Sequence, residues 1–107
     1  MPFTAVVKSL DETQPQDFPL EQNYPNPFNS GTVIRFALPA DGAVELAVYN
    51  LAGQKVAALV DGERQAGAYA VRWDGRDDTG RSLASGLYLY RIKADGYEQT
   101  RKLLLVR

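Results

Sequence analysis

The chain has 107 residues, of which 45% are hydrophobic, and its formal net charge is −1. This length accommodates one domain of about seven short strands, and no apolar run approaches the roughly 18 residues of a membrane-spanning helix, so we expect a soluble chain. The chain has no cysteine and no histidine, which excludes disulfides, thiol nucleophiles, imidazole acid–base pairs and most zinc or copper sites, and an enzyme is not expected.

Residues 1–17 form the first segment, and their polar composition predicts a linker. The short run Phe3–Val7 fits a stray strand, whereas Ser9–Asp17 is polar. We interpret residues 1–17 as the tail of a linker from an upstream domain. The first seven residues lack the basic start and the long apolar stretch of a secretory signal, so we expect any such signal to lie upstream.

A proline-rich segment separates this linker from the rest of the chain. We call it the proline clasp, and it consists of Asn23, Tyr24, Pro25, Asn26, Pro27, Phe28 and Asn29. Its two prolines fix φ and hold the residues before them away from the helical region. Asparagines favour turns, and Tyr24 and Phe28 supply two large apolar anchors. We predict a stiff, extended structural start to a domain, rather than a recognition element.

Alternating apolar residues predict a series of strands after the clasp, each ending at a turn. The expected ranges are 32–38, 43–50, 55–60, 67–74, 86–92 and 97–106. Gly53 suits a tight hairpin turn, and Asp95-Gly96 is typical of a two-residue hairpin. No stretch keeps a helical period. The pattern predicts an all-β fold, an immunoglobulin-like antiparallel β-sandwich of about seven strands over residues 18–107, with Trp73 in the core.

The loop Asp74–Gly80 holds the densest acidic cluster, and carboxylates on a short loop are ligands for calcium. When the EF-hand pattern is aligned from Asp74, a cation, Arg76, stands at the third position. Thr79 occupies the place of the turn glycine, and Ser85 the place of the bidentate glutamate. We therefore predict a turn stabilised by bonds from backbone N–H groups to aspartates, with a looser calcium site as the alternative.

Tyr88 and Tyr90 alternate along one predicted strand, and Tyr97 lies on the returning strand of the hairpin. Aromatic rows of this kind stack sugars or bases in some proteins, although packing within a sheet is their more common use. A carbohydrate-binding module is kept as an alternative. Nucleic acid is not expected as a partner, because no basic stripe runs between the aromatic residues.

The second half of the chain is basic: from Arg64 onward it has nine Lys/Arg and five Asp/Glu, a difference of +4. Such charges protect the edge of a sheet against aggregation. The run Leu103–Val106 is apolar on both faces, which indicates either a buried last strand or a segment that a partner recognises. The residues predicted to bind a partner are Arg101, Lys102, Leu103, Leu105 and Arg107.

No nucleophile elbow, phosphate-binding loop or metal-ligand spacing occurs in the sequence. The glycines stand at predicted turns. We therefore assign no catalytic residue, no cofactor and no metal ligand from the sequence.

Six motifs resemble the type A C-terminal sorting domains of type IX secretion. They are Leu20–Asn29, Val48–Gln54, Ala66–Gly67, Trp73–Gly80, Ala84–Arg91 and Thr100–Lys102, in order and at the family's spacing. Within them Trp73, Asp74, Gly86 and Tyr88 join the clasp residues as expected structural positions. Two departures are small: Ser30 stands where a third proline is usual, and Tyr69 where a histidine is often seen.

This resemblance implies an immunoglobulin-like sandwich at the end of a larger exported protein. The passenger would enter the periplasm by its own signal peptide, and the outer-membrane translocon would recognise this domain. Sortase-type machinery would then cleave the domain and anchor or release the passenger at the cell surface. We expect a monomer. The immunoglobulin-like domain of flagellar hook-capping proteins shares much of the pattern, so a structural or assembly module is the alternative function.

Overall fold

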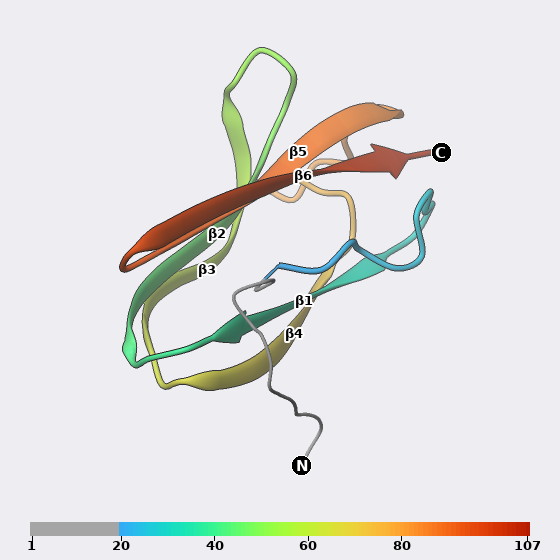
Figure 1. Cartoon of the computed structure of the whole chain (residues 1–107). Coiled ribbons are helices and arrows are strands. Elements are labelled where there is room, and N and C mark those ends of the chain that lie inside the picture. Colours follow the sequence, from blue (N-terminus) through green and yellow to red (C-terminus); the bar gives the residue numbers. More distant parts are fainter. Residues whose placement is uncertain (1–19) are drawn as a thin grey trace.

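The computed structural model describes residues 20–107, which form an all-β fold (Figure 1). The linker and the stray strand that the sequence predicts within residues 1–17 lie outside this range. The strands are β1 (Thr32–Leu38), β2 (Gly42–Tyr49), β3 (Lys55–Arg64), β4 (Gly67–Trp73), β5 (Gly86–Ala94) and β6 (Tyr97–Leu105). Within residues 20–107 no helix is long and apolar enough to cross a membrane.

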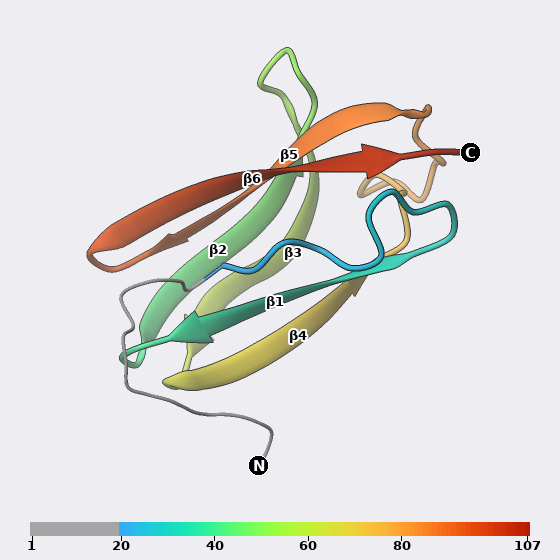
Figure 2. The same ribbon diagram turned by 45° about the vertical axis from the view of Figure 1, so that its right-hand side comes forward.

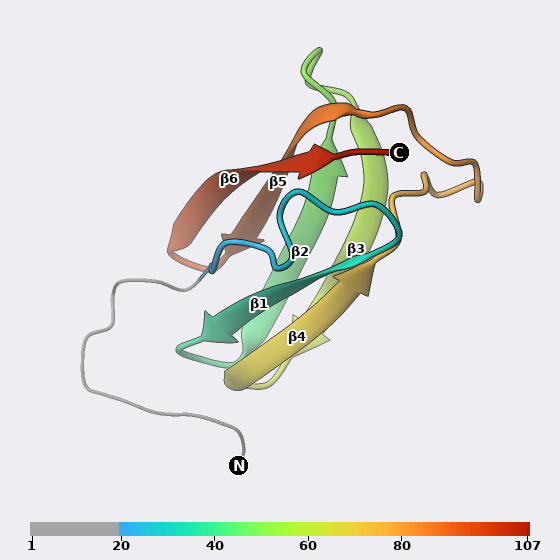
Figure 3. The same ribbon diagram turned by 90° about the vertical axis from the view of Figure 1, so that its right-hand side faces the viewer.

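Two antiparallel sheets pack face to face (Figures 2 and 3). One contains β1 and β4, and the other has the strand order β3-β2-β5-β6. This arrangement confirms the predicted immunoglobulin-like sandwich. The prediction of about seven strands is wrong for the described residues, which contain six.

The proline clasp and the residues just before it occupy the place where a seventh strand would lie. Instead of a continuous ladder they make three isolated bridges, from Leu20 to Phe36, from Tyr24 to Val33 and from Phe28 to Leu105. Proline has no N–H to donate, so two prolines in five residues prevent a regular ladder. In all three ribbon views this segment runs between β1 and β6.

Strand β3 is longer than the sequence pattern indicates. The predicted range, 55–60, stops before the turn-like pair Asp61-Gly62, but Asp61 pairs with Glu45 and Gly62 with Val44 on the neighbouring strand. Gly62 has φ +132°, a value that favours glycine. The glycine therefore lets the strand continue rather than turn.

The core lies between the sheets and receives one face of each strand. Trp73 is 3% exposed, and its ring lies 5.7 Å from the ring of Phe28 and 6.1 Å from that of Tyr88, measured between centroids. The indole N–H donates to the carbonyl of Arg76 at 2.9 Å. The predicted position of Trp73 in the core is confirmed, and Phe28 brings the clasp into the same aromatic cluster.

Candidate functional site

The proline clasp hydrogen-bonds to both sheets through its backbone. Towards β1, Tyr24 and Val33 exchange two N–H···O bonds of 3.0 and 2.9 Å. Towards β6, the N–H of Phe28 donates to Leu104 O at 3.1 Å, and the N–H of Val106 donates to Phe28 O at 2.8 Å. The clasp therefore closes one side of the sandwich.

Beneath the clasp lies a buried polar network centred on the hydroxyl of Tyr90. This hydroxyl donates to Glu21 O at 2.6 Å and accepts from the N–H of Asn23 at 2.8 Å. The amide of Asn23 donates to Thr32 Oγ1 at 3.0 Å and to Pro25 O at 3.2 Å. Burial raises the pKa of Tyr90 to about 12. Such a network fixes the clasp because each buried polar group has its partner.

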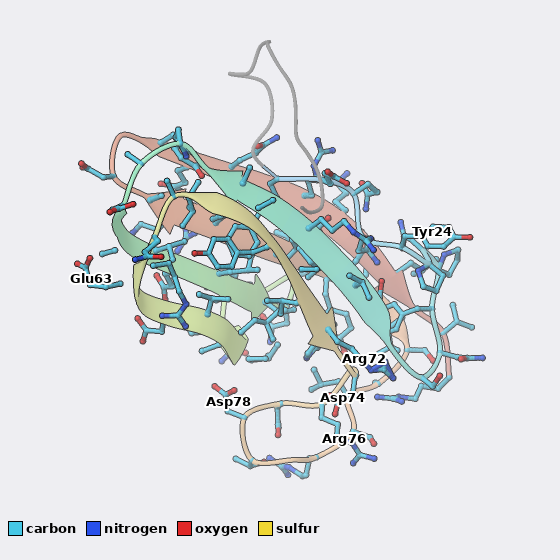
Figure 4. The ribbon with its side chains drawn as sticks, turned by 90° about the horizontal axis from the view of Figure 1, so that it is seen from below. Tyr24, Glu63, Arg72, Asp74, Arg76 and Asp78 are labelled. Carbon is cyan, nitrogen blue, oxygen red and sulfur yellow. The ribbon has the colours of Figure 1, made fainter. Side chains whose placement is uncertain are left out.

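Tyr24 differs from its predicted role. Its side chain is 74% exposed and points away from the body of the domain (Figure 4), so Phe28 alone is an apolar anchor. The peptide bonds Tyr24–Pro25 and Asn26–Pro27 are both cis. The side-chain oxygen of Asn26 accepts from the N–H of Leu104 at 2.9 Å, which adds a further bond to β6.

The acidic loop between β4 and β5 binds its own backbone. One carboxylate oxygen of Asp77 accepts from the N–H groups of Thr79 and Arg81, both at 3.0 Å, and these bonds, with the Thr79 hydroxyl foremost, lower the pKa of Asp77. Asp78 accepts from the N–H of Ala58 at 3.1 Å. The bonds agree with the predicted turn, and residues 20–107 contain no cluster of three acidic groups that could hold a metal.

A cleft of about 440 Å³ lies beside this loop, where β3 and β4 face each other. Arg72, Asp74 and Arg76 are among its lining residues (Figure 4). Arg76 forms an ion pair with Asp74 at 3.7 Å, and Arg72 donates to Ser30 O at 3.1 Å. Because these groups already have partners within the domain, we assign no ligand to the cleft.

The tyrosines suggested as a sugar-binding face belong to the core. Tyr88 is 8% exposed and Tyr90 is fully buried. The hydroxyl of Tyr97 donates to Ala37 O at 3.1 Å, across to the other sheet. Tyr97 is half-buried against the core, but with Tyr88 and Tyr90 buried no row of exposed rings remains, which removes the aromatic row as a basis for a carbohydrate-binding module. Gly86, another predicted structural position, is the first residue of β5, the strand that carries Tyr88 and Tyr90, and it pairs with Leu105 of β6.

The residues predicted to bind a partner do not share one surface. Leu103 and Leu105 are fully buried. The guanidinium of Arg101 donates to Leu20 O at 2.7 Å. Lys102 is exposed on the opposite face of the strand, because side chains alternate along β6.

Arg107 connects three segments that are distant in sequence. Its guanidinium donates to Leu83 O at 2.9 Å, to Asn29 O at 3.3 Å and to Gly75 O at 2.6 Å. Gly75 has φ +80°, and a Cβ at that position would lie 2.7 Å from Arg107 Nη2. The positive φ favours glycine at this position, and a Cβ would also displace the Arg107 guanidinium. Sequence reasoning missed this role, since no local pattern marks an arginine that binds distant carbonyls.

Replacing Arg107 with alanine should destabilise the domain by about 1–2 kcal/mol, because three carbonyls lose a charged donor. The matched control is Lys102→Ala, an exposed cation on β6 without an ion pair among residues 20–107. Urea unfolding of both variants provides the measurement. Equal midpoints for the two would contradict a structural role for Arg107.

The chain matches a known protein family. The family model of the FlgD Ig-like domain matches residues 24–98, which include most of the clasp and strands β1 to β5. The chain belongs to the FlgD Ig-like domain family. No curated protein matches it.

Solved structures share the fold of this FlgD Ig-like domain. Latent PorU from Porphyromonas gingivalis superposes with a TM-score of 0.66 at 21% identity, over 92% of this chain and 10% of PorU. PorZ, an essential surface component of the type IX secretion system of that bacterium, superposes with a TM-score of 0.54 at 18% identity, over 80% of this chain and 11% of PorZ. FlgD from P. aeruginosa superposes with a TM-score of 0.53 at 23% identity, over 71% of this chain and 66% of FlgD. The chain thus spans about a tenth of PorU and PorZ.

Proposed function

We propose that this FlgD Ig-like domain is a C-terminal secretion signal of the type IX system. The outer-membrane translocon recognises it, exports the upstream passenger in the same chain, and sortase-type machinery anchors the passenger at the cell surface. The observation that carries the proposal is the likeness to PorZ, a type IX component, over 80% of this chain. The six sequence motifs point to the same system.

The architecture suits a signal that is recognised as a folded unit. The clasp covers the β6 end of one sheet and the β1 edge of the other through backbone bonds. A closed sandwich of this kind keeps its core away from water while the chain passes through the periplasm. Only side chains on its surface are then available to a translocon, and Lys102 and Arg107 are the exposed members of the predicted set.

The proposal is tested with a folded reporter that carries its own secretory signal peptide and is followed by residues 1–107, expressed in a bacterium that has a type IX system. We expect the reporter on the cell surface, where added protease digests it on intact cells. In a strain without the translocon it should stay in the periplasm.

The matched control replaces residues 1–107 with the Ig-like domain of P. aeruginosa FlgD, which has the same fold. We expect no surface display of this control. Equal display of both fusions would mean that the fold alone suffices, and a periplasmic wild-type fusion would refute the proposal.

A structural module of flagellar hook-cap type is the second candidate. The family match and the 66% coverage of FlgD favour it. Under this alternative the wild-type fusion remains in the periplasm in both strains, so the same experiment separates the two functions.

A further inference from the structure

Exposed apolar side chains gather at one end of the four-stranded sheet. The large hydrophobic residues most exposed among residues 20–107 are Tyr24, Leu51, Leu87, Leu104 and Val106. Leu87 and Leu104 stand directly opposite each other on β5 and β6. Val106 follows Leu104 by two positions, and its backbone bond to Phe28 keeps the chain extended there. The three side chains therefore share the outer face of the sheet.

The register extends this group across the sheet. Leu89 lies opposite Lys102 on one side and opposite Tyr49 on the other. We call Leu87, Leu89, Leu104, Val106 and Lys102 the outer patch. A contiguous exposed apolar patch on a domain surface is a mark of an interaction site, whereas apolar residues exposed singly are ordinary.

The other end of the same face is polar, and it holds two ion pairs. Glu45 forms an ion pair with Lys55, and Arg91 lies 3.6 Å from Glu98. Arg91 also stacks over the ring of Tyr49, with 4.8 Å from Cζ to the ring centroid. The face thus changes along its length from charged side chains to exposed apolar side chains.

The outer patch carries positive charge without a local counter-ion. Lys102 has no carboxylate within 4.0 Å among the described residues, and neither do Arg101 and Arg107. Arg101 and Arg107 alternate with Lys102, Leu104 and Val106 along the chain, and they bind carbonyl oxygens away from this patch. An approaching surface therefore meets apolar side chains beside one unpaired cation, Lys102.

The edge of β6 at this end does not accept an added strand. Phe28 already bonds to the backbone of Leu104 and Val106, and Asn26 accepts from the N–H of Leu104. A partner must therefore contact the face of the sheet through side chains, not extend it by backbone pairing.

We infer that the outer patch is the surface on which this domain docks to a protein partner that offers apolar side chains and a carboxylate for Lys102. The inference rests on the proposed function and names the surface that the translocon contacts. A second copy fits poorly, because in a symmetric interface the patch would meet itself, and it contains no carboxylate to pair with Lys102. An anionic membrane fits poorly too, since stable adsorption takes a cluster of several exposed cations.

The test uses the reporter fusion with two changes in the outer patch, Leu104→Glu and Lys102→Glu. Their matched controls are Leu51→Glu, another exposed leucine, and Arg35→Glu, an exposed cation on the outer face of β1. We expect surface display to fall about tenfold or more for each patch variant and to stay at the wild-type level for each control. All four purified chains should keep the thermal midpoint of the wild type, since every changed side chain is exposed.

The outcomes test the outer patch and the proposed function separately. Normal display of both patch variants, with normal display of the wild type, would overturn the patch and leave the proposed function standing. A wild-type fusion that is not displayed overturns both.

A photo-crosslinking residue in place of Leu104 identifies the occupant. A crosslink to a translocon subunit that Lys102→Glu abolishes supports the docking surface. A crosslink to a second copy of the chain, or binding to vesicles of anionic lipid that Leu104→Glu abolishes, would overturn it.

Discussion

Replacing Trp73 with alanine should lower the free energy of unfolding by about 3–5 kcal/mol. The side chain is 3% exposed and contacts the rings of Phe28 and Tyr88. Alanine would leave a cavity where the clasp meets β4 and β5, and the carbonyl of Arg76 would lose its donor. Domains are stable by only about 5–15 kcal/mol, so this one change removes a large share.

Urea unfolding followed by far-UV circular dichroism measures the effect, because the variant has no tryptophan left to fluoresce. Trp73→Phe is the matched variant: it keeps an aromatic ring in the cluster and loses the bond to Arg76, so we expect a smaller loss of about 1–2 kcal/mol. A loss below about 1 kcal/mol for Trp73→Ala would show that the ring does not organise the core.

The strands with clean alternation were predictable from the sequence. In β1, Ile34, Phe36 and Leu38 share a face, and all three are buried in the structure. The range predicted for this strand, 32–38, agrees with the observed Thr32–Leu38. A period of two is a local property, and one buried face is enough to produce it.

The misjudged features depend on residues that are distant in sequence. Asp61-Gly62 resembles a turn locally, but pairing with β2 keeps it in β3. Residues 20–107 contain no seventh strand because the prolines of the clasp cannot form a ladder, and the clasp instead makes single bridges to strands on both sides. Composition alone does not show which partner supplies such a bridge.

The surface near β6 was predictable only in part. The sequence identified a basic, apolar end of the chain but not which side chains face outward. The sheet register places Leu103 in the core and Lys102 and Leu104 on the outer face. A shift by one residue would reverse these positions, and that register is fixed by pairing with β5.

Above pH 10 the free energy of unfolding should fall more steeply with pH for the wild type than for a variant that lacks the Tyr90 hydroxyl. Burial raises the pKa of Tyr90 from 10.0 to about 12, so the folded domain keeps this proton while the unfolded chain releases it. The stabilisation is therefore fully present below pH 10 and is lost as the pH rises from about 10 to about 12. Two pKa units correspond to about 2.7 kcal/mol at most.

The measurement is the free energy of unfolding in urea between pH 8 and pH 12 for the wild type and Tyr90→Phe. At pH 8 the variant should be less stable by about 1–2 kcal/mol, because Glu21 O and the N–H of Asn23 lose their buried partner. This deficit should shrink as the pH rises, since only the wild type carries the tyrosine. Burial also raises the pKa of Tyr97, but that residue is present in both proteins and cancels in the difference.

Tyr24→Phe is the matched control, because Tyr24 belongs to the clasp but its side chain is exposed. We expect its profile to follow the wild type at every pH. A difference between wild type and Tyr90→Phe that stays constant from pH 8 to pH 12 would mean that the hydroxyl exchanges protons freely with water. The polar network beneath the clasp would then be open to solvent, and the clasp would be held by Phe28 and its backbone bonds alone.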